Sequence, residues 1–437
     1  MQTGRRFADR YLLLGDARAG GMGTVHRAID ADSGATVALK IVQIDSDQER
    51  DRFEREATIL GHLEHPGIVR YLAHGIADHG ACYLAMDWVD GTTLADRLIS
   101  PGLSARDAVG IARQLGETLA VVHRHGIVHR DIKPANIMLT GGDLAAVRLI
   151  DFGVARRIGD SQRLTWTGTL VGTPGYMSPE QARGVKAIDA RADLFALGCV
   201  LYECMTGRPT FSGEHATAVR ALILEDQPAP PRAFSEDISL AHERLVLHLL
   251  AKDPVDRTPS ANHFLEELAA AGMPPEGPLR RRHIADTPTH LETATLPDRT
   301  VFLLLTDLSA APQEVEAVLR AAAARYGAQI EIMADGRTFA TLRETTSDLL
   351  RAAGRFALEL RGEMPPDVPV VLAFATGGNA FARAIERAVT LLDDAEVEAA
   401  MTPRSNLLWL DADAAAILDD TFEIETHGAS HRLCGER

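Results

Sequence analysis

The stretch GIVHRDIKPANIML, residues 126–139, places a polar run between two apolar ends. Between Val128 and Ile137 it contains a histidine, two bases, an acid and an amide. A buried strand or helix would not be interrupted in this way. A polar loop held at both ends by buried residues is how a fold presents side chains to a reacting molecule. We therefore expect a reactive loop here and work outward from it.

Length and composition predict a globular protein with more than one domain. The 437 residues exceed one core of usual size, and 46% of them are hydrophobic. No apolar run approaches the roughly 18 residues of a membrane helix, and the start does not resemble a signal peptide. Four cysteines without metal or disulfide spacing favour a reducing compartment. The net charge of −16 argues against a nucleic-acid partner. We therefore expect a cytoplasmic protein without a membrane span.

The order of strand-like and helix-like patterns predicts three regions. Residues 11–90 read as short strands with one helix, in which Phe53, Ala57 and Leu60 have helical spacing. From Ser104, a cap residue, helices dominate, so residues 91–271 form a helical lobe of the same α+β unit. Residues 272–299 are rich in Pro and Thr and read as a linker. Residues 300–437 have a β-α-β-α pattern, which indicates a smaller α/β domain.

A glycine-rich turn precedes the polar loop in the chain. In ARAGGMGTV, residues 17–25, Gly20, Gly21 and Gly23 lie between two predicted strands, where backbone N–H groups can approach phosphate oxygens. Such a turn alone is more often an ordinary hairpin. Lys40 ends a following strand, and Glu56 lies on the helix after it. Lys40 could pair with Glu56 and point its ammonium group at phosphates.

Two further motifs, LIDFGVA (149–155) and GTPGYMSPE (172–180), follow in order. With them the chain resembles the eukaryotic-type (Hanks-type) serine/threonine protein kinases over about residues 11–271. Its GGMGTV and TPGYMSPEQ look like the bacterial branch. The complete ordered signature is highly specific. The resemblance implies the two-lobed kinase fold, with a β-rich N-lobe and a helical C-lobe, and a role in bacterial signal transduction.

The resemblance also implies roles for the polar loop. Asp131 matches the aspartate that orients the acceptor hydroxyl and takes its proton, and Lys133 would neutralise the γ-phosphate. Asn136 and Asp151 would hold Mg²⁺ or Mn²⁺. Phosphoryl transfer requires that the acceptor and the phosphate be positioned in line, and that cations stabilise the negative charge spreading over the phosphate oxygens.

The ATP contacts are implied in the same way. Lys40 would grip the α- and β-phosphates, and Glu56 would hold Lys40. The residues that would surround the nucleotide, besides Lys40, are Ala17, Gly20, Gly21, Gly23, Val25, Ala38, Met86, Asp87, Val89 and Met138. The family's first glycine is replaced by Arg18, so we expect ATP affinity or loop motion to differ.

Specificity and activation follow from the same likeness. Lys133, two positions after Asp131, is typical of serine/threonine enzymes, and Thr173 matches a residue that contacts that aspartate and lysine. Asp193 would hold the backbone of the polar loop. A phosphate on the segment 151–180 could bridge arginines and order it. The candidate phosphorylation sites in that segment are Thr165, Thr167 and Thr169.

The C-terminal domain weakly resembles the class III nucleotide cyclases, which implies a ferredoxin-like fold. Asp307 and Asp335 fall at the positions of the metal aspartates. The base-reading lysine and the transition-state asparagine and arginine correspond to Glu331, Glu386 and Thr390. The acidic Glu386 is unsuited to stabilising the negative charge that develops in the transition state. We therefore expect a non-catalytic interaction or sensing domain. The abrupt end at LCGER suggests a natural short form or a fragment.

Three functions are therefore compared. The leading hypothesis is an active, ATP- and Mg-dependent kinase that phosphorylates proteins. The second is a pseudokinase scaffold, which retention of the motif residues disfavours. The third is a nucleotide cyclase regulated by a kinase-like lobe, which the missing lysine disfavours. Dimerisation through either domain stays open.

Overall fold

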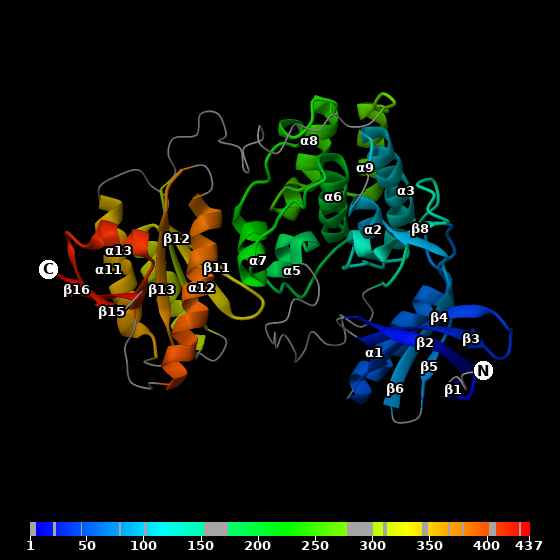
Figure 1. Cartoon of the computed structure of the whole chain (residues 1–437), viewed down its shortest axis with the longest axis horizontal. Coiled ribbons are helices and arrows are strands. Elements are labelled where there is room, and N and C mark those ends of the chain that lie inside the picture. Colours follow the sequence, from blue (N-terminus) through cyan, green and yellow to red (C-terminus); the bar gives the residue numbers. More distant parts are fainter. Residues whose placement is uncertain are drawn as a thin grey trace. The chain divides into compact units, whose positions relative to one another are not determined.

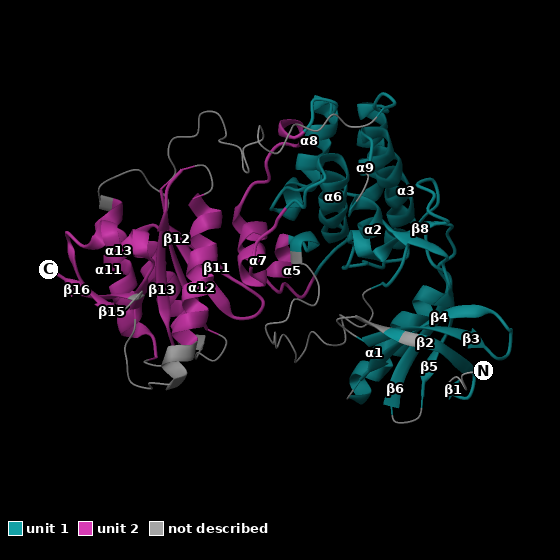
Figure 2. Ribbon diagram, viewed as in Figure 1, with its two compact units in different colours: residues 1–178, 188–210, 235–281 teal, residues 179–187, 211–234, 282–437 magenta. Residues whose placement is uncertain are grey.

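The computed structural model describes residues 6–20, 23–44, 46–77, 80–99, 103–152, 174–277, 300–308, 313–342, 348–365, 368–377, 380–401, 408–427 and 430–437. The chain divides into two compact units (Figures 1 and 2). Unit 1 comprises Met1–Ser178, Ile188–Thr210 and Ser235–Arg281. Unit 2 comprises Pro179–Ala187, Phe211–Phe234 and Arg282–Arg437.

Unit 1 begins with a six-stranded sheet of order β1-β2-β3-β4-β6-β5. Its strands are β1 (Arg6–Phe7), β2 (Tyr11–Gly20), β3 (Gly23–Asp30), β4 (Thr36–Gln43), β5 (Tyr71–Ile76) and β6 (Ala81–Asp87). Helix α1 (Asp47–Gly61) begins at Ser46, whose side chain accepts a hydrogen bond from Glu49 N. It packs against β5 and β6 and buries Phe53, Ala57 and Leu60, which confirms the helical spacing predicted for these three residues.

The rest of unit 1 is mainly helical. Its helices are α2 (Leu94–Ile99), α3 (Ala105–Arg124), α6 (Arg191–Thr206), α8 (Leu240–Leu249) and α9 (Ala261–Ala271), with short 3₁₀ turns η2 (Pro134–Asn136), η3 (Pro174–Tyr176) and η5 (Pro254–Asp256). A three-stranded sheet, β7-β8-β9, consists of β7 (Gly91–Thr93), β8 (Ile137–Thr140) and β9 (Val147–Leu149).

Helix α3 starts as the sequence predicts. Ser104 and Asp107 form a capping box, in which each side chain accepts from the other residue's backbone N–H. The helix packs against α6 and α9. Almost every residue of α6 is buried, so this apolar helix is the centre of the helical part.

Unit 2 is built on a seven-stranded sheet of order β11-β12-β10-β13-β14-β16-β15. Its strands are β10 (Val301–Asp307), β11 (Gln329–Ile332), β12 (Arg337–Leu342), β13 (Val370–Ala375), β14 (Leu408–Leu410), β15 (Phe422–His427) and β16 (Ser430–Glu436). Its helices are α5 (Pro179–Ala182), α7 (Ala216–Glu225), α10 (Gln313–Tyr326), α11 (Asp348–Glu363), α12 (Ala380–Met401) and α13 (Ala412–Leu418), with the turn η4 (Pro231–Ala233). Strands β13 and β14 are parallel, whereas β10 is antiparallel to both of its neighbours.

The sheet of unit 2 is covered on both faces. Along β10, Phe302 and Leu304 join the core beneath α10 and α11, and the strand also packs against α12. This explains why all but the last residue of β10 are buried. The predicted β-α-β-α pattern is therefore present. The grouping of α5 and α7 with this domain was not predicted from the sequence.

None of the helices in the described ranges combines the length and the apolar character that a membrane crossing requires.

Candidate active site

The polar loop brings its acid, base and amide together. Asp131 Oδ2 accepts hydrogen bonds from Lys133 Nζ and from Asn136 Nδ2, both at 2.8 Å. Asn136 Nδ2 also donates to the backbone oxygen of Asp131 at 2.8 Å. The 3₁₀ turn η2 makes this possible, because it folds Asn136 back over Asp131 before β8 begins. The carboxylate of Asp131 is about a quarter exposed, so it can be reached from solvent.

The backbone of the loop is held by Asp193 of α6. Its Oδ2 accepts from His129 N and from His123 Nε2, and its Oδ1 accepts from Arg130 N, each at 2.8 Å. Burial would raise the pKa of Asp193, but the hydrogen bond from His123 and the further donors hold its pKa below the usual range. Arg130 has φ 66°, a left-handed conformation costly for a residue with a side chain. The Asp193 carboxylate therefore restrains a strained loop, as the resemblance implied.

The hydrogen bonds of His129 show which of its ring nitrogens carries the proton. Its ring is buried and packs against Phe152 in a tilted arrangement, with the centroids 4.5 Å apart. Nδ1 accepts from Asp131 N at 3.3 Å, so the proton resides on Nε2, which faces Ile150 O at 3.2 Å. A second proton on Nδ1 would oppose the N–H of Asp131. Burial also lowers the pKa of His129, so the ring is neutral.

Lys40 contacts the carboxylate predicted to hold metal. Its Nζ donates to Asp151 Oδ1, and the lysine is 7% exposed. Asp151 follows β9 with φ 60°, which turns the chain sharply after the strand. Sequence reasoning placed Lys40 at the phosphates and Asp151 at the metal ion but did not predict this contact. Glu56 lies half-buried on α1, and its pairing with Lys40 stays a prediction.

The predicted nucleotide contacts lie on neighbouring strands. Val25 pairs with Lys40 across β3 and β4, and Ala38 pairs with Met86 across β4 and β6. Val25 and Ala38 are partly exposed, whereas Met86 is buried. Asp87 ends β6, Val89 follows it, and Met138 lies on β8. These residues can therefore face a common ligand.

The glycine turn joins β2 to β3. Gly20 pairs with Gly23 at the end of the hairpin, and Ala17 is exposed on β2. Gly23 has φ 151°, and a Cβ there would lie 2.2 Å from Ile41 O. Only glycine fits this position without a shift of β4.

Several predicted residues lie outside the described ranges. They are Gly21, Thr165, Thr167, Thr169 and Thr173. Their proposed roles stay predictions.

Asn136 and Asp151 suit a hard divalent cation. Carboxylate and amide oxygens are the ligands Mg²⁺ prefers, and Mg²⁺ is commonly held by one or two protein carboxylates together with substrate phosphates. Because Nδ2 of Asn136 bonds to Asp131, its Oδ1 is the ligand atom that this side chain can offer. Backbone pairing of Ile150 N with Asn136 O, at 3.0 Å, keeps the two segments adjacent. No cluster of three or more His, Cys, Asp or Glu suited to a metal occurs within the part of the chain that the structure describes.

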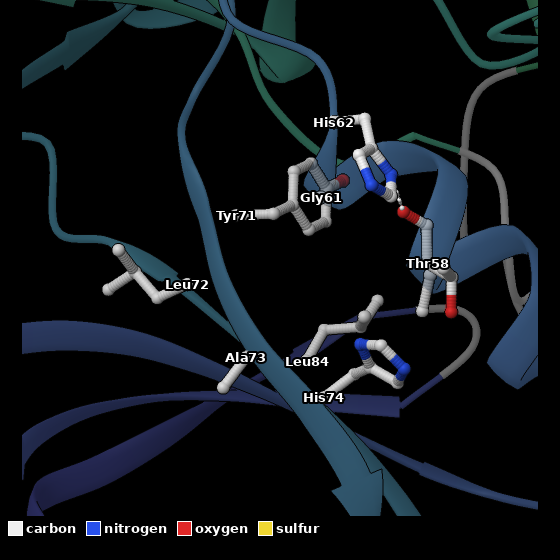
Figure 3. A pocket seen from close by; sticks show the side chains of 9 residues that line it. Thr58, Gly61, His62, Tyr71, Leu72, Ala73, His74 and Leu84 are labelled. Atoms are coloured by element: carbon white, nitrogen blue, oxygen red, sulfur yellow. Dashed lines mark hydrogen bonds between the residues drawn. The ribbon is translucent and has the colours of Figure 1, made fainter.

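A separate cavity of about 380 Å³ lies in the N-terminal sheet region (Figure 3). Its lining comes from the end of α1, from β5 and from β6, and includes Tyr71, His62 and His74. None of its lining residues is a predicted nucleotide contact. This cavity is therefore distinct from the predicted ATP site.

Known proteins resemble this chain over its N-terminal part. The model of the protein kinase domain family matches residues 14–268, more than half of the chain. The chain is 39% identical over 287 residues to serine/threonine-protein kinase PknB of Mycobacterium leprae (strain TN), covering 64% of this chain and 46% of that protein. It is 39% identical over 288 residues to PknB of Mycobacterium tuberculosis (strain ATCC 25618 / H37Rv), with the same coverages. A crystal structure of Rad53 1-466 in complex with AMP-PNP matches 60% of this chain and 66% of that chain, with a TM-score of 0.47 and 27% identity.

The chain spans about half the length of the curated relatives that it matches. The match to the family model includes the glycine turn, Lys40, the polar loop and Asp151. Through residues 14–268, the chain belongs to the protein kinase family.

Proposed function

We propose that this protein is an active serine/threonine protein kinase that uses ATP and Mg²⁺ or Mn²⁺ in bacterial signalling. The observation that carries the proposal is the cluster in which Lys133 and Asn136 both hydrogen-bond to Asp131. A scaffold without activity would have no need for a solvent-accessible carboxylate held by a base and an amide. The names of the PknB relatives support serine and threonine as acceptors.

In the proposed reaction, Asp131 orients the acceptor hydroxyl and takes its proton as the oxygen attacks the γ-phosphorus. The bond from that phosphorus to the β–γ bridging oxygen breaks, and ADP leaves. Lys133 and Lys40 oppose the negative charge on the phosphates. A divalent cation at Asn136 and Asp151, when bound, would neutralise charge on the phosphates. Lys40 must leave Asp151 for the α- and β-phosphates before this arrangement is complete.

We also propose activation by autophosphorylation, chiefly at Thr167 or Thr169, with Thr165 as a further candidate. Arg130, beside the catalytic aspartate, and Arg52, on α1, would supply charge for the added phosphate. Thr173 would contact Asp131 and Lys133 in the active form. Mass spectrometry of active enzyme tests this, and finding none of the three threonines modified would defeat it.

For residues 300–437 we propose a ferredoxin-like, cyclase-type fold without catalytic activity. The chain order β10-α10-β11-β12-α11-β13 and the strand order β11-β12-β10-β13 support the fold. Asp335, predicted at a metal position, forms an ion pair with Arg220, which supports a role in binding protein rather than metal. Asp307 lies at the end of β10.

The discriminating experiment incubates the full chain with labelled ATP and Mg²⁺. A kinase yields phosphoprotein, a pseudokinase yields no product, and a cyclase yields cyclic nucleotide. Lys40→Met is expected to abolish phosphoprotein formation, because Lys40 is the cation proposed for the α- and β-phosphates. Lys186→Met is the matched control, since Lys186 is exposed and outside the site. Absence of phosphoprotein from the wild-type chain, with folding intact, would overturn the proposal.

A further inference from the structure

Unit 2 combines two segments of the matched kinase region with the C-terminal domain. These segments are Pro179–Ala187, which contains α5, and Phe211–Phe234, which contains α7. Figure 2 shows both in the colour of residues 282–437. Helix α7 packs against α5 and against α12 of the C-terminal domain. The polar side chains between them show how the two parts recognise each other.

The first contact lies beside α5. Arg183 makes a two-pronged ion pair with Glu331 of β11, with Nη2 to Oε1 at 2.7 Å and Nε to Oε2 at 2.8 Å. This pairing raises the pKa of Arg183. Next to it, Ala334 N donates to Ala182 O at 2.9 Å. Two parallel side-chain bonds and one backbone bond fix orientation as well as proximity.

The second contact lies on α7. Arg220, only 2% exposed, pairs with Asp335, in the turn between β11 and β12. The neighbouring Arg337 donates to Thr217 Oγ1 at 2.7 Å and to Asp393 Oδ1 at 3.1 Å. A buried arginine without a carboxylate would be strongly unfavourable. The C-terminal domain therefore supplies a carboxylate to this buried arginine of α7.

The third contact precedes α7. Glu214 N donates to Glu386 Oε1 at 3.0 Å. A Cβ at Gly213 would lie 2.2 Å from the same oxygen, so a larger residue there would require the Glu386 side chain to move. Burial raises the pKa of Glu386. The acid is therefore partly desolvated against the kinase segment.

These contacts are all polar. In three contacts the kinase segments donate, through Arg183, Arg220 and Glu214 N, to carboxylates of the C-terminal domain. In two others the C-terminal domain donates, through Ala334 N and Arg337. Together Glu331, Ala334, Asp335, Arg337, Glu386 and Asp393 form what we call the docking face. Such directional, charge-assisted bonds give specificity, and they weaken when salt screens the partly exposed members.

We propose that residues 300–437 are a docking domain whose ligand is the α5 and α7 segments of the same chain, bound reversibly through the docking face. The bound state hides Arg220 and Thr217 from any other acidic partner. It also tethers Pro179–Ala187, which continues the chain from the predicted activation segment. The proposal goes beyond kinase activity and does not depend on it.

The test uses the full chain with a specific protease site inserted within residues 278–299, cleaved after folding. The two fragments of the wild-type chain are expected to co-elute at about 0.1 M salt and to bind at least 10-fold more weakly at about 1 M, where the Debye length falls to about 3 Å. Dilution in the analytical ultracentrifuge gives the dissociation constant. No ATP is present, so failure of the kinase proposal would not affect the result.

Reversing the charges of an ion pair tests whether the docking face holds the two fragments together. Arg183→Glu is expected to weaken association at least 10-fold, because two carboxylates then face each other. Adding Glu331→Arg to that variant should recover most of the loss, which a merely misfolded protein would not do. Arg244→Glu is the control, as Arg244 is exposed on α8, and should bind like wild type.

Three results would overturn the proposal. The cut wild-type fragments could elute separately at about 0.1 M salt, where surface ion pairs are only partly screened. Arg183→Glu could bind as tightly as wild type. The reversed pair could bind no better than the single reversal.

Discussion

Replacing Asp193 by Asn tests whether this carboxylate sets the geometry of the polar loop. The amide keeps the shape but offers one oxygen where the acid offers two. In the more favourable orientation of the amide, its oxygen still accepts hydrogen bonds from His123 Nε2 and His129 N. The NH₂ group then faces the N–H of Arg130. One buried N–H then loses its acceptor, which costs about 1–3 kcal/mol. The remaining two bonds lose about 1 kcal/mol each of charge assistance.

The expected loss is therefore about 3–5 kcal/mol of unfolding free energy. For a domain of about 150–250 residues this lowers Tm by about 6–20 °C. Without the hydrogen bond to Asp193, the left-handed backbone conformation of Arg130 loses a restraint that offsets its cost of about 1–2 kcal/mol. As the loop relaxes, Asp131 leaves its bonds with Lys133 and Asn136. We expect kcat to fall at least about 10-fold, since about 1.4 kcal/mol corresponds to that factor.

The assay combines thermal unfolding with steady-state phosphorylation of a protein substrate. The KM for ATP should change less than kcat, because the proposed phosphate contacts lie on β3 and β4. Asp189→Asn is the matched control. Asp189 is exposed and accepts a local hydrogen bond from Arg191 N at 2.8 Å, which the side-chain oxygen of asparagine can also accept. If Asp193→Asn left both Tm and kcat at wild-type values, the reasoning would be refuted.

The other predictions concern one titrating side chain and one helix. Burial lowers the pKa of His129 below 6.5, so below that pH the unfolded chain binds more protons than the folded chain. The folded state should therefore lose stability as the pH drops below about 6.5. In the His129→Phe variant, Tm should fall less between about pH 7.5 and 5.5 than it does in the wild type. Gly354→Ala in α11 would place a Cβ 2.4 Å from the ring of Phe422 and should cost about 1–3 kcal/mol by chemical denaturation. Gly362→Ala, in the same helix with open space around it, should be neutral or gain up to about 1 kcal/mol; equal effects at both glycines would contradict the packing argument.

Local features of the fold could be predicted from the sequence because their causes are local. The capping role of Ser104 and the helical spacing of Phe53, Ala57 and Leu60 both depend on neighbours within one or two turns. The polar loop is similar. Asp131, Lys133 and Asn136 lie within six residues of each other, so their clustering in one turn follows from the chain itself.

The contact of Asp193 with the polar loop was implied by the family resemblance, but other contacts between distant residues were not predicted. Lys40 was expected to pair with Glu56, yet its contact with Asp151 spans 111 residues. Arg183 and Glu331 are 148 residues apart. The periodicity of apolar residues predicts which face of a helix or strand is buried. It does not predict which of the many Asp and Glu side chains pairs with a given arginine. The partner is chosen by the tertiary fold, and no local pattern reports it.

The pairing of Arg220 with Asp335 bears on how the chain is made. The two residues are 115 positions apart, so at synthesis rates of about 5–20 residues per second the arginine is synthesised roughly 6–23 s before its carboxylate. During this interval the guanidinium of Arg220 has no Asp335 carboxylate with which to pair. Slower translation between these codons would lengthen the interval, and the yield of native protein should then depend on elongation rate.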